Sequence, residues 1–394
     1  MPALAFIGFG LPLVYVAWRL QQRVDKGDLA EAELLTESIA QTPSALRWED
    51  IPHVDRISIE LGFRLVYLAD KDKGEELVQT LRGIRKTLSE QSGFLLPEVR
   101  VRDNLQLNPQ EYRIKLAGVP LATGRLNPQQ LLALNTGDIY GQLDGEITRD
   151  PAYGLEAVWI DNNTRAKALN LGYSVVDLAT VIATHAGKVI KEHLSELFVY
   201  EDVKQLNKRL AAVAPVLAEA LDKALTATVQ LKVYRLLLRE QVSLGDILSI
   251  ASTLLDSSEV TKDPILLTSD VRCALQRALV RQISGDKEEL SAFTLDEKLE
   301  QTLQSALNQA MQAGKVTLDS FPVAPNLLSQ FQRNMPLICS QMQQQGHTPA
   351  LVVIPQLRPL LARYARTFTQ NSLAVLSYNE IPETVRVNVI GALG

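Results

Sequence analysis

Cysteine is nearly absent from this chain of 394 residues, which has Cys273 and Cys339 and no CxxC pair. So few cysteines argue against both a disulfide framework and a cysteine-based zinc site, and they suit a reducing compartment such as the cytoplasm. Cys339 follows apolar residues and has no histidine near it in the sequence. We therefore predict a buried, inert thiol there and not a nucleophile.

Histidine is also scarce, and the whole set is His53, His185, His193 and His347. His185 and His193 fall in one helical pattern, eight residues apart. On a helix, that spacing separates them by about 80° around the axis and about 12 Å along it, which is too far for one metal ion. We predict no metal site, and we assign His185 to capping, core packing or a hydrogen bond.

The sequence also lacks the common catalytic signatures. It contains no GxxxxGK[ST] phosphate loop, no GxGxxG, no GxSxG and no HExxH. The acidic residues between 286 and 299 predict a solvated segment, since an acid–base pair requires a pocket. The net charge of −5 gives no reason to expect nucleic-acid binding, which needs a concentrated basic face. We predict no catalytic centre, no cofactor and no nucleic-acid partner.

What the chain does have is the composition of a globular protein. Hydrophobic residues make up 46% of it and charged residues 22%, which is not the composition of a disordered chain. A length of 394 residues predicts two to four domains, at roughly 100–200 residues each.

The N-terminal residues stand apart from this soluble pattern. Residues 2–18 carry no charge and are mostly apolar, and Arg19 and Arg23 follow them. As a helix this run would span roughly 26 Å, slightly short of a hydrocarbon core of about 30 Å. Basic residues after the apolar run are the reverse of a signal peptide, and they fit a transmembrane helix whose C-terminal side faces the cytoplasm. A buried core helix is the alternative.

An acidic stretch comes next. Between residues 25 and 50, seven acidic residues stand against two basic ones, and Thr42, Pro43 and Ser44 interrupt the helical pattern. Such a segment stays solvated and extended beneath a membrane with anionic lipids, which repel it. We interpret residues 23–50 as a linker, either a specific tether or a simple flexible spacer.

From residue 57 onward, the hydrophobic periodicity predicts a mixture of strands and helices. The first part combines strands with one helix, at 57–68 (broken at Gly62), 74–91 and 97–102. The second part begins with a helix over 129–134, where Asn127 serves as N-cap and Pro128 occupies the first turn. A further helix then lies between two strands, at 157–160, 164–171 and 173–176.

Past Asp177 the pattern becomes helical. Short turns separate the predicted helices, which cover 178–197, 201–213, 216–224, 227–240, 246–256 and 268–283. Antiparallel helices with short connections predict a bundle-like domain. The last part returns to alternating helices and strands, at 295–313, 350–354, 356–367, 374–378 and 385–390. Strand, helix, strand in this order predicts a right-handed parallel crossover.

Three short motifs in one stretch carry the most specific signal. They are Asp-Pro-Ala-Tyr-Gly-Leu at 150–155, Gly-Tyr-Ser-Val-Val-Asp at 172–177 and Val-Ile-Ala-Thr-His at 181–185, and matching stretches continue at 237–246 and 374–382. In order and spacing they resemble the signature of the type III secretion export gate family, the large membrane protein that flagella and virulence injectisomes share. The resemblance covers nearly the whole chain. It implies a docking ring for secretion substrates and not an enzyme.

The resemblance also implies how the chain divides. The fold class would be α+β and multidomain, with one N-terminal transmembrane helix, a linker, two small α+β subdomains, a helical subdomain and a C-terminal α/β subdomain. The corresponding residues are 1–22 for the last helix of a membrane domain, 23–50 for the linker, 51–128 with 178–197 for subdomain 1, 129–177 for subdomain 2, 198–270 for the ring-forming subdomain 3, and 271–394 for subdomain 4.

Within the flagellar members of the family, an aspartate, an aromatic and a threonine border a cleft that docks chaperone–substrate complexes. Their counterparts here are Asp150, Tyr153 and Thr184. An aromatic with a polar rim is a good anchor for a partner helix, at about 2 kcal/mol or more. Flagellar members prefer phenylalanine where this chain has Tyr153, and the added hydroxyl implies a more polar site. In the alternatives, Asp150 and Pro151 only build a turn while Tyr153 fills the local core, or partners dock between adjacent C-terminal subdomains.

The helical subdomain implies self-association into a ring of nine. A closed ring requires a heterologous interface, with different surfaces on the two sides of each subunit. Arg239, Glu240 and Asp246 are candidates for ion pairs across that interface. They could equally form an exposed cluster within one helix or loop.

The family's partners and location complete the expectation. The partners are secretion chaperone–effector complexes and a gatekeeper, the stalk of the export ATPase complex, and other inner-membrane export proteins, with most of this chain in the cytoplasm. The wording of the VIATH motif and the short end after residue 390 favour a virulence injectisome over a flagellum. A soluble α/β metabolic enzyme and a membrane-anchored adaptor unrelated to secretion are the alternatives.

Overall fold

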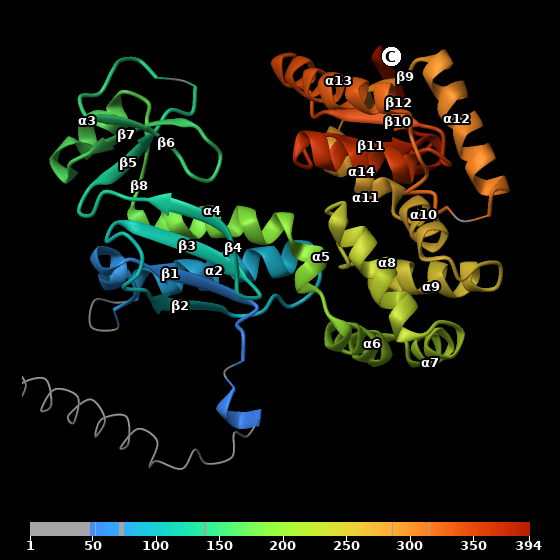
Figure 1. Ribbon diagram of the computed structural model, residues 1–394, viewed down its shortest axis with the longest axis horizontal. Coiled ribbons are helices and arrows are strands. Elements are labelled where there is room, and N and C mark those ends of the chain that lie inside the picture. Colours follow the sequence, from blue (N-terminus) through green and yellow to red (C-terminus); the bar gives the residue numbers. More distant parts are fainter. Residues whose placement is uncertain (1–47, 52, 71–74, 138, 286, 315) are drawn as a thin grey trace, which may run out of the picture. The chain divides into compact units, whose positions relative to one another are not determined.

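The computed structural model describes residues 48–51, 53–70, 75–137, 139–285, 287–314 and 316–394 (Figure 1). The chain divides into two units, Met1–Val54 and Asp55–Gly394. The predicted transmembrane helix at 1–22 and most of the predicted linker at 23–50 lie outside the described residues, which begin with a 3-10 turn over Trp48–Asp50. Among the helices that the structure describes, none combines the length and the apolar character that a membrane span requires.

A four-stranded mixed sheet opens the second unit. Its strands, in the spatial order β2-β1-β3-β4, are β1 (Ile57–Leu61), β2 (Val99–Asp103), β3 (Glu111–Leu116) and β4 (Val119–Arg125). β2 runs parallel to β1, whereas β3 and β4 are antiparallel to their neighbours. Helices α2 (Glu76–Ser92) and α4 (Leu178–Glu192) pack on each other and on this sheet, because each buries one apolar face.

A small antiparallel sheet lies between β4 and α4 in the chain. In the spatial order β6-β7-β5-β8, its strands are β5 (Leu131–Leu134), β6 (Glu146–Arg149), β7 (Glu156–Ile160) and β8 (Ser174–Val176). Helix α3 (Arg165–Asn170) packs against β8. This sheet has its own small core, but β5 also contributes Leu132 to the main core. The two faces of β5 therefore serve two cores.

Helices alone form the middle of the unit. They are α5 (Leu194–Leu197), α6 (Tyr200–Val213), α7 (Pro215–Ala224), α8 (Ala227–Arg239), α9 (Ile247–Ser258), α10 (Pro264–Ala274) and α11 (Gln276–Ser284). Side-chain caps define several starts, since Thr226, Asp246 and Asp263 each accept a hydrogen bond from a backbone N–H in the first turn of α8, α9 and α10. Short connections between well-capped helices are what the sequence predicts here.

A parallel sheet with three helices completes the chain. Its strands, in the spatial order β11-β10-β9-β12, are β9 (Glu289–Leu295), β10 (Ala350–Val353), β11 (Ala374–Ser377) and β12 (Arg386–Leu393). The helices are α12 (Glu297–Gln312), α13 (Pro325–Gln344) and α14 (Arg358–Thr369). β10 and β11 pair in parallel across α14, which confirms the predicted strand–helix–strand unit. For the described residues, the predicted multidomain α+β fold class is also confirmed.

The predicted helix over 129–134 is wrong. Gln129 has a φ of 69°, and the residues after it form β5, which pairs with β7 on one edge and β8 on the other. Leu132 and Ala133 are both fully buried, one in each core. Burial on both faces of a central strand outweighed the helix-start signal of Asn127 and Pro128.

Two further expectations are corrected. Only the first half of 57–68 is a strand, because the chain turns at Gly62 into a 3-10 helix over Phe63–Ala69. The predicted helix over 268–283 begins earlier, at Pro264, and is split at Leu275 into α10 and α11. The two halves have different partners, since α10 packs on α8 and α9 while α11 packs on β9.

Several elements were not predicted at all. They are β3, β4, β6, β9 and α13. β9 lies within the stretch that the sequence indicated to be solvated, yet it buries Leu290 and Ala292. The structure separates residues before Asp55 from the rest, and the subdomain boundaries inside Asp55–Gly394 stay a prediction.

Candidate docking site

The loop that joins β6 to β7 contains the first of the three motifs. The backbone N–H of Asp150 donates to the carbonyl of Leu155 at 2.8 Å, and that of Gly154 donates to the carbonyl of Asp150 at 2.8 Å. The Asp150 carboxylate accepts a further bond from the N–H of Tyr153 at 2.6 Å. Gly154 has a φ of 70°, a left-handed conformation that glycine adopts without strain. Asp150 thus stabilises a tight turn through both its backbone and its carboxylate.

The turn places Tyr153 outward. Its side chain is 63% exposed, whereas Asp150 is only 5% exposed. Asp150 therefore does build a turn, but Tyr153 does not fill the local core. An exposed aromatic on a rigid turn presents a large contact area at little entropic cost on binding.

Helix α4 ties this loop to the main sheet. Lys188 donates to the backbone carbonyl of Ala152 at 2.7 Å, and its ammonium lies 5.6 Å from the centroid of the Tyr153 ring. Thr184, half-buried, precedes Lys188 by one helical turn and so lies on the same face of α4. The structure thereby brings Tyr153 to the helix that carries Thr184, with Lys188 as the contact between them.

Beneath this surface lies a buried pair, Tyr112 of β3 and His185 of α4. The Tyr112 hydroxyl and the His185 Nδ1 are 2.8 Å apart, so a hydrogen bond is the role that the structure shows among the three predicted for His185. Burial lowers the pKa of His185, against the opposing charge of Asp150. Burial raises the pKa of Tyr112, and the Asp150 charge raises it further. Both groups are neutral at pH 7, and the Asp150 turn and α4 are therefore joined to the main sheet above an uncharged hydrogen bond.

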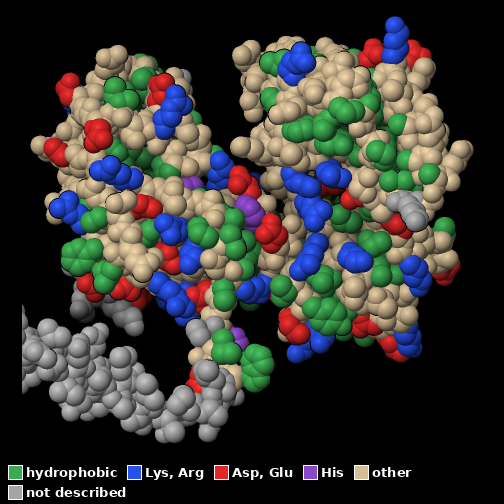
Figure 2. All heavy atoms as spheres, viewed as in Figure 1, with side chains coloured by type: hydrophobic (Ala, Val, Ile, Leu, Met, Phe, Trp, Pro, Cys, Tyr) green, Lys and Arg blue, Asp and Glu red, His purple; other side chains and the backbone are tan. Residues whose placement is uncertain are grey.

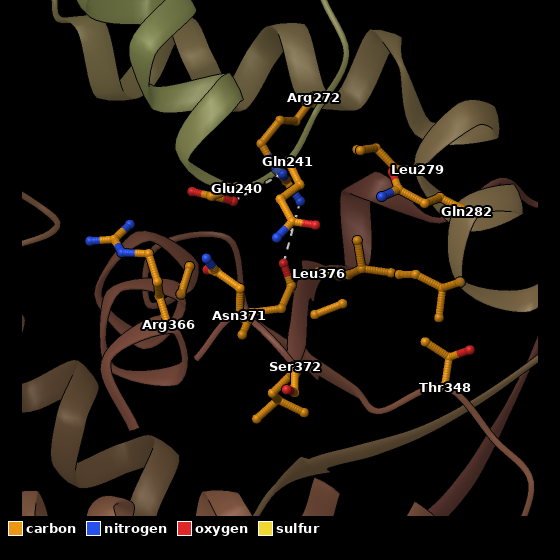
Figure 3. A pocket seen from close by; sticks show the side chains of 15 residues that line it. Glu240, Gln241, Arg272, Leu279, Gln282, Thr348, Arg366, Asn371, Ser372 and Leu376 are labelled. Carbon is orange, nitrogen blue, oxygen red and sulfur yellow. Dashed lines mark hydrogen bonds and ion pairs between the residues drawn. The ribbon is translucent and has the colours of Figure 1, made fainter. Parts of the chain in front are cut away.

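Glu240, a predicted interface residue, forms ion pairs within its own chain. Its carboxylate is 2.9 Å from the Nη1 of Arg272 and 2.6 Å from the Nη1 of Arg358. Glu380 pairs with the same two arginines, at 2.7 Å and 3.3 Å. Figure 3 shows Glu240 and Arg272 beside a pocket of about 200 Å³. Burial alone would raise the pKa of Glu240, but the Arg358 and Arg272 guanidiniums outweigh it and hold that pKa below its usual value.

This square of two arginines and two glutamates was missed by sequence reasoning. The pair Arg272–Glu380 spans 108 positions of the sequence and the pair Glu240–Arg358 spans 118. No local pattern reports contacts over such separations.

The other two predicted interface residues lie on the surface or at a helix end. Arg239, the last residue of α8, is exposed. Asp246 caps α9 by accepting a hydrogen bond from the N–H of Ser249 at 3.1 Å. The cross-subunit role of Arg239, Glu240 and Asp246 stays a prediction. In the part of the chain that the structure describes, no cluster of three metal-ligating side chains is present.

The comparison that decides the family covers nearly the whole chain. The model of the FHIPEP family matches residues 1–386. The chain belongs to the FHIPEP family. Membership confirms the resemblance to the type III secretion export gate family.

Curated relatives of this FHIPEP protein carry flagellar names. It is 46% identical over 396 residues to the putative flagellar export/assembly protein LfhA of Escherichia coli O44:H18, a match of all of this chain and 56% of that protein. It is 36% identical over 395 residues to the flagellar biosynthesis protein FlhA of Escherichia coli K12, of which the match covers 55%. The chain spans about half the length of these relatives.

Solved structures of low sequence identity share the fold. The Chlamydia pneumoniae CdsV chain, solved in a complex with CdsO, has a TM-score of 0.74 at 20% identity, with 88% of this chain and all of that chain covered. The nonameric EPEC SctV-C has a TM-score of 0.65 at 17% identity, with 87% of this chain and 99% of that chain covered. At these identities the likeness shows the fold alone.

Proposed function

We propose that this chain is the cytosolic part of an export gate in a flagellar-type protein export system, with the bulk of it in the cytoplasm below the inner membrane. The support is the 46% and 36% identity to proteins with flagellar names. The injectisome preference drawn from the VIATH wording is not confirmed, and the named relatives favour the flagellum. The first two subdomains and the helical and C-terminal subdomains keep their predicted boundaries in this proposal.

The chain assembles into a homo-nonameric ring in this proposal. The related EPEC domain is a nonamer, and the helical part of this chain exposes apolar side chains that one subunit alone leaves in water. They are Val213, Val216, Leu248, Val260 and Leu266. Exposed apolar groups on one region favour association, and a closed ring requires different surfaces on its two sides.

Secretion chaperones with their bound substrates dock on the ring at Asp150, Tyr153 and Thr184. One observation carries this part of the proposal, namely that the exposed Tyr153 ring is held from below by the Asp150 turn and from the side by Lys188. Ile147 and Leu155 add exposed apolar surface on the same hairpin. An aromatic anchor with an apolar surround suits an amphipathic partner helix.

Other partners follow from the same proposal. They are a gatekeeper, the stalk of the export ATPase complex and the membrane-embedded export proteins that receive the substrate. The complex of the related CdsV with CdsO supports binding of at least one accessory protein to this fold. Membership of the FHIPEP family supports this proposal over the enzyme and adaptor alternatives.

The docking proposal is tested by replacing Tyr153 in the purified chain. Tyr153→Ala should weaken binding of a cognate flagellar chaperone–substrate complex by about 2 kcal/mol, or roughly 30-fold, whereas Tyr153→Phe should retain binding. Isothermal titration calorimetry gives the dissociation constants. Tyr140→Ala is the matched control, because Tyr140 is also an exposed tyrosine of the same part of the fold. Unchanged affinity in Tyr153→Ala would place the docking site elsewhere.

A further inference from the structure

A second small hollow lies beside the Glu240 square, between the end of α8 and helix α14. Four arginines line it, together with two acids, over a volume of about 30 Å³; they are Arg239, Arg358, Arg363, Arg366, Glu240 and Asp319. This hollow, called here the arginine hollow, admits a single small group. Figure 2 shows Lys and Arg side chains gathered in a band over this part of the molecule.

The charges of the arginine hollow do not balance. Arg358 is already neutralised, because it belongs with Arg272 to the square that Glu240 and Glu380 complete. Three arginines therefore remain against the single carboxylate of Asp319. This excess of positive charge attracts a negative group, and the half-buried Arg366 would interact with it more strongly than the exposed Arg239 and Arg363.

None of the three remaining guanidiniums pairs with a carboxylate in the described ranges of the chain, although Arg363 lies 5.9 Å from the centroid of the Tyr364 ring. Among the described residues, Arg239 and Arg366 make no side-chain hydrogen bond or ion pair, and Arg363 donates only to the backbone carbonyl of Asp319, at 2.9 Å. The Asp319 carboxylate instead accepts from the Thr317 hydroxyl at 2.6 Å. In Figure 3, Arg366 rises from α14 on the same side of the pocket as Glu240, and no dashed line reaches it.

Arg366 lies where the like charges meet. It is half-buried, and burial together with the Arg239 and Arg363 guanidiniums lowers its pKa, against the opposing charges of Glu240 and Asp319. Arg366 lines both the arginine hollow and the larger pocket of Figure 3. A half-buried cation that repels its neighbour and has no acceptor is a cost to the fold unless an anion occupies the site.

We propose that the arginine hollow binds one oxyanion group, a carboxylate or a phosphate. Arg239, Arg363 and Arg366 supply planar guanidiniums that match both groups in two-pronged hydrogen bonds. The anion would neutralise charge contributed by α8 and by α14, and would hold these two helices together. Binding at this site is independent of the docking of partners at Tyr153.

The test is titration of the purified chain with three probes at constant ionic strength, with chloride as the reference. The probes are inorganic phosphate, succinate and a hexapeptide of glutamate, and calorimetry with thermal unfolding reads the binding. Binding of phosphate alone identifies a phosphate group, and binding of the two carboxylate probes alone identifies a carboxylate. Binding of phosphate and of the carboxylate probes supports a site that accepts either oxyanion. No binding beyond chloride overturns the proposal.

Arg366→Gln separates ligand binding from a structural role. The variant should lose affinity for the probe about tenfold or more, yet unfold at the same temperature or higher when no probe is present, since it removes a repelling charge. Arg277→Gln is the matched control, an exposed arginine of α11 outside the hollow. Equal probe affinity in wild type and Arg366→Gln, or lower stability of Arg366→Gln without probe, overturns the assignment.

Discussion

At the residue scale, the most constrained charges in the described chain are those of the Arg272, Arg358, Glu240 and Glu380 square. Arg358 and Glu380 are almost completely buried, and Glu380 also accepts from the N–H of Ser377 at 3.4 Å. Taking four charges out of water is costly, so the square adds little net stability as a whole. Its members depend on one another, because losing one leaves the others buried and unpaired.

Glu380→Gln should lower the free energy of unfolding by about 3–5 kcal/mol, since two buried arginines then share one carboxylate. Urea denaturation followed by circular dichroism gives the value. Glu219→Gln is the control, because Glu219 forms only an exposed pair with Lys223 and its loss should cost about 0.5 kcal/mol or less. If Glu380→Gln lost no more free energy of unfolding than Glu219→Gln, the four charges of the square would not depend on one another.

The buried His185 predicts a pH dependence of stability. Its folded pKa lies below the ordinary 6.5, so the unfolded chain binds the proton more readily. The contribution of His185 to the free energy of unfolding should be fully present above about pH 6.5 and should fall as the pH drops below that value. His185→Gln should flatten the profile between pH 7.5 and 5.5, measured by urea midpoints, while His193→Gln at the end of the same helix should not. Identical slopes in wild type and His185→Gln would contradict this.

At the element scale, the sequence was informative where one face of a helix is buried and the other exposed. The helices from α6 to α9 begin and end close to the predicted residues, because apolar spacing and caps such as Thr226 act locally. The helix predicted over 178–197 begins where expected, after Asp177, but is split at His193 into α4 and α5. β4 was missed because nearly all of its side chains are exposed or half-exposed and no alternation appears. α13 was missed because it contains Pro336 and begins at Pro325.

At the candidate docking site, too, local structure could be predicted from the sequence and tertiary contacts could not. The Asp150 turn could be predicted from its own residues, and the structure shows that turn. The contact of Lys188 with Tyr153 could not, because it joins a hairpin of one sheet to a helix packed on another. Contacts of this kind depend on the tertiary arrangement.

The junction of α2 with the helical part depends on one glycine. Gly93 ends α2 with a φ of 81°, and a Cβ placed there would lie 2.2 Å from the backbone nitrogen of Gly245. Gly93→Ala should therefore lower the free energy of unfolding by about 3 kcal/mol or more. Gly346→Ala is the control, with a φ of 74° and open space around it, and should cost about 1 kcal/mol. Thermal and urea unfolding measure both variants. Equal losses of stability in Gly93→Ala and Gly346→Ala would exclude the predicted clash.

At the scale of the whole molecule, the unit Asp55–Gly394 combines three sheets and a helical segment. The main core runs from the first sheet through the helices to β9 and β10, and a second core fills the other side of the last sheet. No pattern in the sequence predicted this continuity. Residues from separate predicted subdomains share one core, so we expect unfolding of these parts to be coupled.

Ring formation is a prediction at this scale. Val260 is 90% exposed in the single chain, so Val260→Lys should leave the unfolding temperature unchanged while it weakens self-association if the helical surface forms the ring. Light scattering over a range of concentrations measures the mass. Leu105→Lys is the control, an exposed apolar residue outside the helices. Association that is equally strong in Val260→Lys would exclude this region of the surface from the interface.

The parallel pairing of β9 with β12 affects how fast the native state can be reached. Glu289 pairs with Arg386, and the three helices α12, α13 and α14 lie between these strands in the chain. Closing so long a loop costs conformational entropy before native contacts form to offset it. High contact order therefore slows folding. The helices from α6 to α9 pack mainly on one another and on α10, which is near them in the sequence. The C-terminal sheet should therefore be the late, rate-limiting event, during which its apolar strands are exposed to aggregation.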